Sequence, residues 1–325
     1  MFKMKKIGVF TSGGDAPGMN ASIRAVVRTA AHHQLEIVGI MHGYDGLMNG
    51  EFNALYPKSV ANIIQRGGTI LKTSRSEKFR TKAGREQAFE QLKKHKIDAL
   101  IAIGGDGTFR GAADLETEFN FPIIGIPCTI DNDLVGTDYT IGYDTAINTV
   151  VDAVDKIRDT AESHERMFVV EVMGRDAGLI ALRTGIASGA MDILIPEIKT
   201  DSSALIEKLK NARKDKTSKI IIVAEGEEEG GAMEVGKKIK NSFPNYDVKV
   251  TVLGHIQRGG NPSCMDRVLA SRLGFAAVEA LLQKKHGMVV GSVNGKIIFT
   301  PFKEATKHIA ELNPEWLKMM EILSA

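Results

Sequence analysis

The chain is built from short apolar runs that each end in a polar, glycine-rich loop. Two of these runs cover residues 97–103 and 122–127, and both are nearly continuous rather than alternating in polarity. Runs of this kind are typical of strands that are buried on both faces of a parallel sheet. The loops Gly104–Thr108 and Thr129–Asp133 follow them. Because ligands bind beyond the carboxyl ends of strands in open α/β sheets, we expect both loops to face one crevice.

The alternation of apolar runs with amphipathic stretches continues along the chain. It predicts strands at residues 7–10, 35–41, 167–172, 193–195, 220–224 and 248–253, and helices at residues 19–32, 59–65, 84–94, 144–163, 205–212, 233–241 and 263–284. Residues 42–46 are expected to form a loop and residues 136–142 a hinge. Strands that alternate with helices indicate an α/β fold, and 325 residues favour two lobes over one core.

Composition narrows the class of protein. The hydrophobic fraction of 43% and the charged fraction of 25% are ordinary for a soluble globular enzyme. A formal net charge of +2 leaves no large basic excess for a nucleic acid partner. No run approaches the ~20 apolar residues that cross a bilayer, so we expect neither a membrane span nor a signal segment. Two cysteines, Cys128 and Cys264, fit a reducing cytoplasm.

The loop Gly104–Thr108 has the residues of a phosphate site. Glycines let backbone N–H groups approach an anion, and a helix that starts near Thr108 adds a positive dipole end. Asp106 would repel phosphate unless a cation lay between them, which points to Mg²⁺. Alternatively, the glycines form a tight strand–helix turn and Asp106 caps the helix. These residues alone leave both interpretations open.

Two further loops are ambiguous in the same way. Gly13–Gly18 lies between a strand and a helix, which suits phosphate binding or a tight turn. It has neither the Gly-Lys-Ser/Thr of a Walker loop nor the glycine spacing of dinucleotide sites. Asp131 and Asp133 could serve proton transfer, but an Asx turn is the commonest use of such residues.

Taken together, these segments resemble the phosphofructokinase family over nearly the whole chain. The resemblance is carried by TSGGDAPGMN at 11–20, RGGT at 66–69, GGDGT at 104–108, PCTIDND at 127–133, VMGR at 172–175 and LGHIQRGG at 253–260. It implies two lobes that each contain a mainly parallel sheet flanked by helices. It assigns residues 1–141 and 256–306 to a nucleotide-binding domain, and residues 142–255 and 307–325 to a sugar-phosphate-binding domain.

The resemblance implies a glycolytic kinase that transfers the γ-phosphoryl group of ATP to the 1-hydroxyl of fructose 6-phosphate, with Mg²⁺, in a cytoplasmic homotetramer. Asp131 is then the catalytic base, and Asp133 binds Mg²⁺ or orients Asp131. Thr129 donates a hydrogen bond to the transferring group, and Arg175 contacts that group in the transition state. The ATP-binding residues implied are Gly14, Tyr44, Arg75, Ser76, Gly105, Asp106, Gly107 and Thr108, with Asp106 also as the metal ligand.

Basic residues of the second lobe are implied to bind the sugar phosphate, because arginine–phosphate pairs are strong and directional. The full set implied is Thr129, Ile130, Asp131, Arg166, Met173, Gly174, Arg175, Glu225, Lys249, His255, Ile256, Gln257 and Arg258. Two alternatives stay open: Arg166 in a surface ion pair and His255 as a structural histidine. We expect the acidic run at residues 227–229 to be a solvated loop.

Departures from the family pattern refine these expectations. Lys249 stands where the family usually has an arginine that reaches the 6-phosphate of a neighbouring subunit. Lysine lacks the bidentate fork, so we expect weaker sugar-phosphate binding. Pyrophosphate-using relatives typically carry Asp at the position of Gly107 and Lys at that of Cys128, so both residues favour ATP as the donor.

A second anion site is also implied, one that binds ADP or phosphoenolpyruvate in bacterial relatives. Its candidate residues here are Arg24, Arg28, Arg158, Gly189, Lys214 and Lys216. Pro57, Met191 and Ser218 replace other effector-binding residues, so we expect an anion to bind but ADP to activate weakly. The rival functions are a pyrophosphate-dependent kinase and a catalytically silent nucleotide-binding regulator on the same fold.

Overall fold

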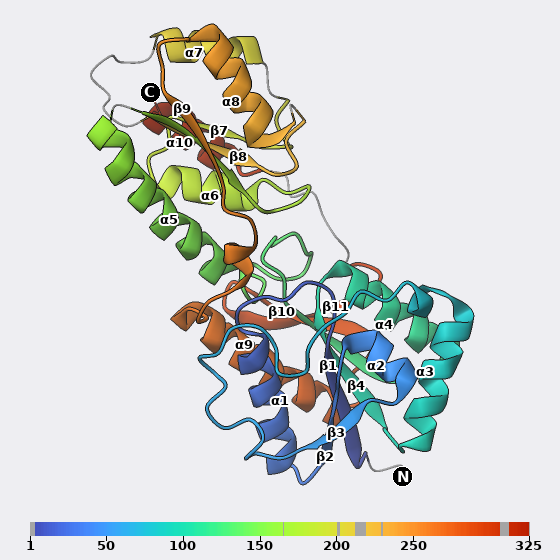
Figure 1. The fold of residues 1–325 in the computed structure, drawn as a ribbon. Helices are drawn as coiled ribbons and strands as arrows, with labels where there is room; N and C mark the ends of the chain where they lie inside the picture. The colour runs from blue at the N-terminus through green and yellow to red at the C-terminus, as the bar shows by residue number, and fades with distance from the viewer. Residues whose placement is uncertain are drawn as a thin grey trace. The chain divides into compact units, whose positions relative to one another are not determined.

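The computed structural model describes residues 4–164, 166–199, 202–211, 219–228, 230–305 and 312–324. The chain divides into two compact units (Figure 1). The first comprises Met1–Ile130, Leu134–Thr145 and Arg258–His308, and the second Asp131–Asp133, Ala146–Gln257 and Ile309–Ala325. The chain therefore crosses between the units several times, and each unit is built from segments that lie far apart in the sequence.

The first unit contains a seven-stranded sheet in the order β11-β10-β5-β4-β1-β2-β3. Its strands are β1 (Lys6–Thr11), β2 (Glu36–Ile40), β3 (Phe52–Leu55), β4 (Ala99–Gly104), β5 (Ile123–Pro127), β10 (Met288–Val293) and β11 (Lys296–Pro301). The five central strands pair in parallel, and only the edge strands β3 and β11 are antiparallel. This arrangement confirms the predicted α/β class.

Helices cover both faces of this sheet. They are α1 (Met19–His32), α2 (Gly43–Asn49), α3 (Lys82–Lys94), α4 (Asp106–Phe119) and α9 (Cys264–Leu282), with a 3₁₀ turn η1 (Lys78–Arg80). One core contains Tyr44 of α2, Leu92 of α3 and Phe109 of α4, packed against Leu100 of β4. Helices α1 and α9 pack against each other outside that core (Figure 1). Strand β4 is buried at every position, as its continuous apolar run predicted.

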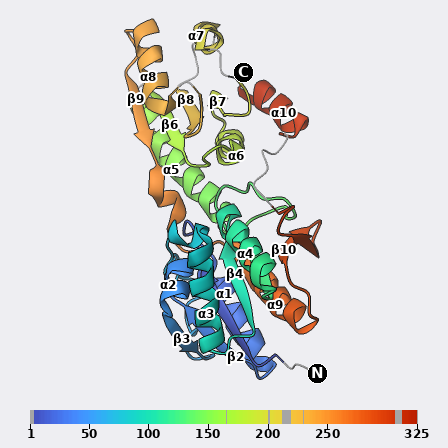
Figure 2. The same ribbon diagram turned by 90° about the vertical axis from the view of Figure 1, so that its right-hand side faces the viewer.

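The second unit contains a four-stranded parallel sheet in the order β7-β8-β6-β9. Its strands are β6 (Met167–Val172), β7 (Asp192–Leu194), β8 (Lys219–Ala224) and β9 (Val248–Val252). Its helices are α5 (Tyr143–His164), α6 (Leu179–Ala187), α7 (Ser202–Asn211), α8 (Gly231–Ser242) and α10 (Pro314–Ser324), with a 3₁₀ segment η2 (Gly254–Arg258). Helices α7 and α8 share a core with the sheet, and α10 packs against α6 (Figure 2).

A buried carboxylate holds the first turn of α5. Asp266, which is 1% exposed, accepts hydrogen bonds from the Gly142 N–H at 2.8 Å and from the Thr145 N–H and hydroxyl at 2.8 and 2.5 Å. Ser263 caps α9 by accepting the Asp266 N–H, and its hydroxyl donates to Asp144. Burial raises the pKa of the Asp266 carboxyl above its usual range. The N-termini of α5 and α9 therefore cap one another.

Several predicted elements were wrong, each for a local reason. Residues 59–65 form turns rather than a helix, because Asn62 adopts a left-handed φ of 55°. Residues 42–46 enter helix α2, which buries the Tyr44 ring against Phe79. Glu227, expected in a solvated loop, is only 6% exposed. The hairpin β10–β11 was not predicted, although Asn294-Gly295 at its turn is a strong hairpin signal.

Among the helices of the described residues, none is both long and apolar enough to cross a bilayer.

Candidate active site

Three loops of the first unit leave the sheet together at the carboxyl ends of β1, β4 and β5. The Ser12 N–H donates to the Ile103 carbonyl at 3.0 Å, and the Cys128 N–H donates to the Gly104 carbonyl at 2.9 Å. The Thr108 hydroxyl donates to the Ser12 carbonyl at 3.1 Å. Within this unit, the loops that the sequence marked as phosphate sites are therefore joined by direct hydrogen bonds.

The loop after β4 begins helix α4 without a side-chain cap. Gly105 is the N-cap residue, and because it has no side chain it cannot cap the helix with one. Asp106 instead contacts Arg110 through both carboxylate oxygens, at 3.1 and 2.8 Å. A Cβ placed on Gly107 would meet no atom within 4 Å, so the space beside it is open. Asp106 is thus the first residue of α4 and not its N-cap residue.

Arg258 lies on the first glycine loop. Its Nη1 donates to the Asp15 carbonyl at 3.1 Å, and its side chain is largely buried. A Cβ placed on Gly14 would lie 2.6 Å from the same Nη1. A residue predicted to bind the sugar phosphate therefore packs against a residue predicted to bind ATP.

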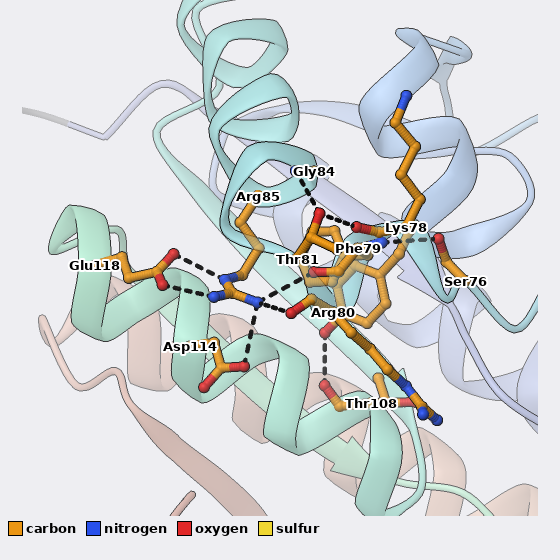
Figure 3. Close-up of polar contacts among 11 residues, drawn as sticks. Ser76, Lys78, Phe79, Arg80, Thr81, Gly84, Arg85, Thr108, Asp114 and Glu118 are labelled. Atoms are coloured by element: carbon orange, nitrogen blue, oxygen red, sulfur yellow. Dashed lines mark hydrogen bonds and ion pairs between the residues drawn. The ribbon is translucent and has the colours of Figure 1, made fainter.

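The segment that carries Arg75 and Ser76 is held by a contact between Ser76 and Phe79 (Figure 3). The Ser76 hydroxyl accepts the Phe79 N–H at 3.2 Å, and the Phe79 ring stacks on Tyr44 with centroids 3.8 Å apart. The Tyr44 hydroxyl donates to the Thr108 carbonyl at 2.5 Å, and burial raises the pKa of that hydroxyl well above its usual range. Tyr44 supports the phosphate loop; its contact with a nucleotide stays a prediction.

Arg85, which sequence reasoning missed, ties that segment to α4 (Figure 3). Its guanidinium binds both carboxylate oxygens of Glu118, at 2.8 and 2.6 Å. It also donates to the carbonyls of Arg80 and Phe79, at 2.7 and 3.3 Å, and lies 3.6 Å from Asp114. Its acidic partners Glu118 and Asp114 are about thirty residues away in the sequence, so no local pattern marks it.

In the second unit, Arg175 follows β6 and faces Asp131. Its Nε lies 4.0 Å from an Asp131 carboxylate oxygen, and the Asp131 side chain is 6% exposed whereas that of Arg175 is 47% exposed. The Arg175 N–H donates to Glu225 at 2.9 Å. The pairing of a buried carboxylate with an accessible arginine joins two of the predicted catalytic residues. Asp106 belongs to the first unit, so its approach to Asp131 stays a prediction.

Other predicted sugar-phosphate residues differ in accessibility. Gln257 is fully buried, accepts the Met173 N–H at 3.1 Å and donates to the Gly254 carbonyl at 3.0 Å. His255 and Ile256 are exposed, whereas Ile130 is fully buried. Gln257 thus joins the loop after β6 to η2.

Arg166 and Lys249 lie at the opposite, amino-terminal edge of the second sheet. Asp247 accepts from Arg166 Nε at 2.7 Å and from Lys249 Nζ at 2.8 Å. Hydrogen bonds lower the pKa of the Asp247 carboxyl, and the bond from Lys249 contributes more than the bond from Arg166. The ion pair that the sequence left open for Arg166 is therefore present.

The predicted effector residues are only partly described. Arg24 and Arg28 lie on α1, with Arg28 exposed, and Gly189 has a left-handed φ of 59°. Arg158 donates to the Ser188 carbonyl. Met191 is buried and Pro57 is exposed. Lys214, Lys216 and Ser218 lie outside the described residues.

The loop at residues 129–133 is anchored at its start. The Thr140 hydroxyl donates to the Thr129 carbonyl at 2.6 Å, and Cys128 bridges to Ile141. Asp133, at 7% exposed, is nearly as buried as Asp131. Cys128 is 1% exposed, and burial raises the pKa of its thiol well above the usual range.

Comparison with known proteins places these features in one family. The sequence profile described as Phosphofructokinase matches residues 6–281. A Cytophaga hutchinsonii protein named ATP-dependent 6-phosphofructokinase is 53% identical over 99% of this chain and 98% of its own length. A Bacillus cytotoxicus protein of the same name is 56% identical over 95% of this chain and 97% of its own length.

Solved structures give the same result. The Pichia pastoris phosphofructokinase is 33% identical with a TM-score of 0.90, over 99% of this chain and 39% of that longer chain. The Marinobacter aquaeolei pyrophosphate-dependent phosphofructokinase matches with a TM-score of 0.86 at 22% identity, over 99% of this chain and 92% of its own length. At that identity the second likeness concerns the fold alone.

The burial of Cys128 predicts selective thiol labelling. At pH 7.5 iodoacetamide should modify the exposed Cys264 and leave Cys128 unmodified, because the thiolate is the reactive form and burial disfavours it. Intact mass measurement should show one adduct on the native protein and two after unfolding in guanidinium. Rapid labelling of Cys128 in the native protein, mapped by peptide mass, would contradict this.

Proposed function

The chain belongs to the phosphofructokinase family, and on this premise we propose that it acts as an ATP-dependent 6-phosphofructokinase. It transfers the γ-phosphoryl group of ATP to the 1-hydroxyl of fructose 6-phosphate and releases ADP and fructose 1,6-bisphosphate. The observation that carries this proposal is the accessible Arg175 beside the buried Asp131 carboxylate. The two free cysteines support a cytoplasmic setting.

Asp131 accepts the proton of the sugar hydroxyl as that oxygen attacks phosphorus. A base in this position must be ionised, and the Arg175 Nε lies 4.0 Å from its carboxylate. Arg175 stabilises charge on the transferring group through its planar donors, and Thr129 donates a further hydrogen bond. Asp133 orients Asp131 or shares in cation binding.

The first unit supplies the residues that bind the nucleotide, and the second supplies most of those that bind the sugar phosphate. Gly14, Gly105, Gly107 and Thr108 present the backbone to the phosphates, and Arg75 and Ser76 lie on the segment that Arg85 ties to α4. The open space beside Gly107 supports ATP over pyrophosphate, because the Asp of pyrophosphate-using relatives would fill it. Glu225, His255 and Arg258 bind the sugar phosphate, together with residues that position them.

A magnesium ion fits this site as a companion of ATP. The described residues contain no group of three side chains able to hold a metal by themselves. Mg²⁺ commonly takes one or two carboxylates with substrate phosphates and water, and the partly exposed Asp106 suits that set. The ion would neutralise charge on the phosphates.

The placement of Arg166 and Lys249 supports a site shared between subunits. Lys249 pairs with Phe168 near the start of β6, whereas Arg175 follows the end of that strand. Six residues of strand span roughly 20 Å, which is longer than a hexose phosphate. If both groups bind the same kind of ligand, Arg166 and Lys249 serve the site of a second copy, in a homotetramer of the kind the family resemblance implies.

One assay can test both the phosphoryl donor and the role of Asp131 as the catalytic base. Wild-type protein should form fructose 1,6-bisphosphate with Mg²⁺ and ATP but not with pyrophosphate, and Asp131→Ala should lower kcat at least ~100-fold. Product is measured by coupled assay with both donors side by side. Turnover with pyrophosphate would contradict the argument from Gly107 and Cys128. Nucleotide binding without turnover would favour a silent regulator.

Shared sites predict complementation. Arg166→Ala and Asp131→Ala homomers should each be nearly inactive, whereas tetramers reassembled from a mixture should regain activity, because some sites then receive both intact residues. Activity after mild dissociation and reassociation is the measurement, with each mutant carried through alone as the control. A mixture no more active than its components would exclude sharing.

Regulation follows from the altered effector residues. An anion should still bind near Arg24 and Arg28, but ADP should activate weakly, given Pro57, Met191 and Ser218. ADP and phosphoenolpyruvate titrations at low fructose 6-phosphate measure this, with Arg24→Ala as the control for binding. Strong activation by ADP would refute it.

A further inference from the structure

The loop that carries Arg175 has a strained backbone. Arg175 has a φ of 53° and Gly174 a φ of 141°. A Cβ on Gly174 would lie 2.3 Å from the Ala177 carbonyl oxygen, and one on Gly226 would lie 1.8 Å from the Arg175 carbonyl oxygen. A left-handed arginine persists only where surrounding contacts hold it. The contacts around this loop therefore fix the backbone position from which the Arg175 side chain extends.

Two carboxylates hold the loop, one near each end. Glu225, which follows β8, accepts the Arg175 N–H at 2.9 Å. Glu197, which follows β7, accepts the Gly178 N–H at 2.7 Å. Between them the Ala177 N–H donates to the Gly174 carbonyl at 3.0 Å and closes the turn. Strands β7, β8 and β6 are neighbours, so the loop is fastened across the carboxyl edge of the sheet.

Glu197 fits tightly against the backbone that it holds. A Cβ on Gly178 would lie 2.5 Å from the second Glu197 oxygen and 2.5 Å from Ile195. That second oxygen is buried and has no hydrogen-bond partner among the described residues. A buried, unpaired carboxylate oxygen is unfavourable, so the folding of β7 alone gives no reason for a glutamate here. The hydrogen bond to the Arg175 loop supplies one.

We propose that Glu197 is a positioning residue for phosphoryl transfer: by fixing the end of the Arg175 loop, it keeps the Arg175 guanidinium beside Asp131. The inference rests on the proposed function, because it requires Arg175 to act on the transferring group. Glu197 acts through Arg175, whose Nε lies 4.0 Å from the Asp131 carboxylate. Its effect should therefore appear in the transition state rather than in the binding of either substrate.

Two substitutions separate the hydrogen bond from the charge. Glu197→Ala removes the acceptor and should lower kcat about 10- to 100-fold, with KM for ATP and fructose 6-phosphate changed less than about 3-fold. Glu197→Gln keeps an oxygen that accepts the Gly178 N–H and should retain kcat within about 3-fold. Initial rates over both substrate concentrations give these values.

A matched control removes similar hydrogen bonds elsewhere. Asp98 accepts the Lys5 and Lys6 N–H groups at 2.7 and 2.9 Å in the first unit, far in sequence from Arg175. Asp98→Ala should lower the melting temperature as Glu197→Ala does, but leave kcat unchanged. If both variants lose kcat in proportion to lost stability, the role of Glu197 is merely structural and the proposal fails.

The double variant Arg175→Ala/Glu197→Ala tests whether Glu197 acts through Arg175. If Glu197 acts through Arg175, the double variant should be no slower than Arg175→Ala alone. The proposal would be overturned if the double variant lost the product of the two single-variant losses in kcat. It would also be overturned if Glu197→Ala kept a kcat near wild type, or if Glu197→Gln lost as much kcat as Glu197→Ala. An Arg175→Ala variant with normal kcat would instead refute the assumed role of Arg175, so the two failures are distinguishable.

Discussion

The parallel register of β1, β4 and β5 is the constraint on which the first unit depends. It sets Thr11 beside Ile103 and Gly104 beside Pro127, so the three strands end at one level. The loops that leave them then hydrogen-bond to the carbonyls at the neighbouring strand ends. Backbone pairing thus aligns the loops. The shared edge is a consequence of parallel strands, and the phosphate loops are placed by it.

Two buried charged residues, Arg85 and Asp266, stabilise the first unit because each makes several hydrogen bonds. Arg85 donates to one carboxylate and two carbonyls, and Asp266 accepts three hydrogen bonds at the first turn of α5. A charge taken from water is tolerated only when such partners replace its hydration. Neither role could be predicted from the sequence, because Gly142 and Glu118 are remote along the chain from the groups that bind them. The family resemblance does not mark them either.

Local physics was enough to predict the strands but not the site. The buried strands were predicted because continuous apolar runs leave few other structures. The roles of Asp131 and Arg175 were implied only by the family resemblance, because an Asx turn explains Asp131 equally well. Helix α2 was missed because its glycine-rich sequence has low helix propensity and its stability comes from packing of Tyr44 on Phe79. Gln257 was predicted as a ligand residue, yet its burial is a tertiary property that no motif reveals. Residue types were thus easier to predict than accessibility.

The packing of Arg258 against Gly14 couples two positions that lie far apart in the sequence. Any side chain at position 14 would push the guanidinium away from the Asp15 carbonyl, because its first carbon would lie only 2.6 Å from Nη1. A side chain there therefore requires the Arg258 guanidinium to move. Two positions far apart in the sequence are thus coupled by one contact, and a substitution at position 14 changes where Arg258 can lie.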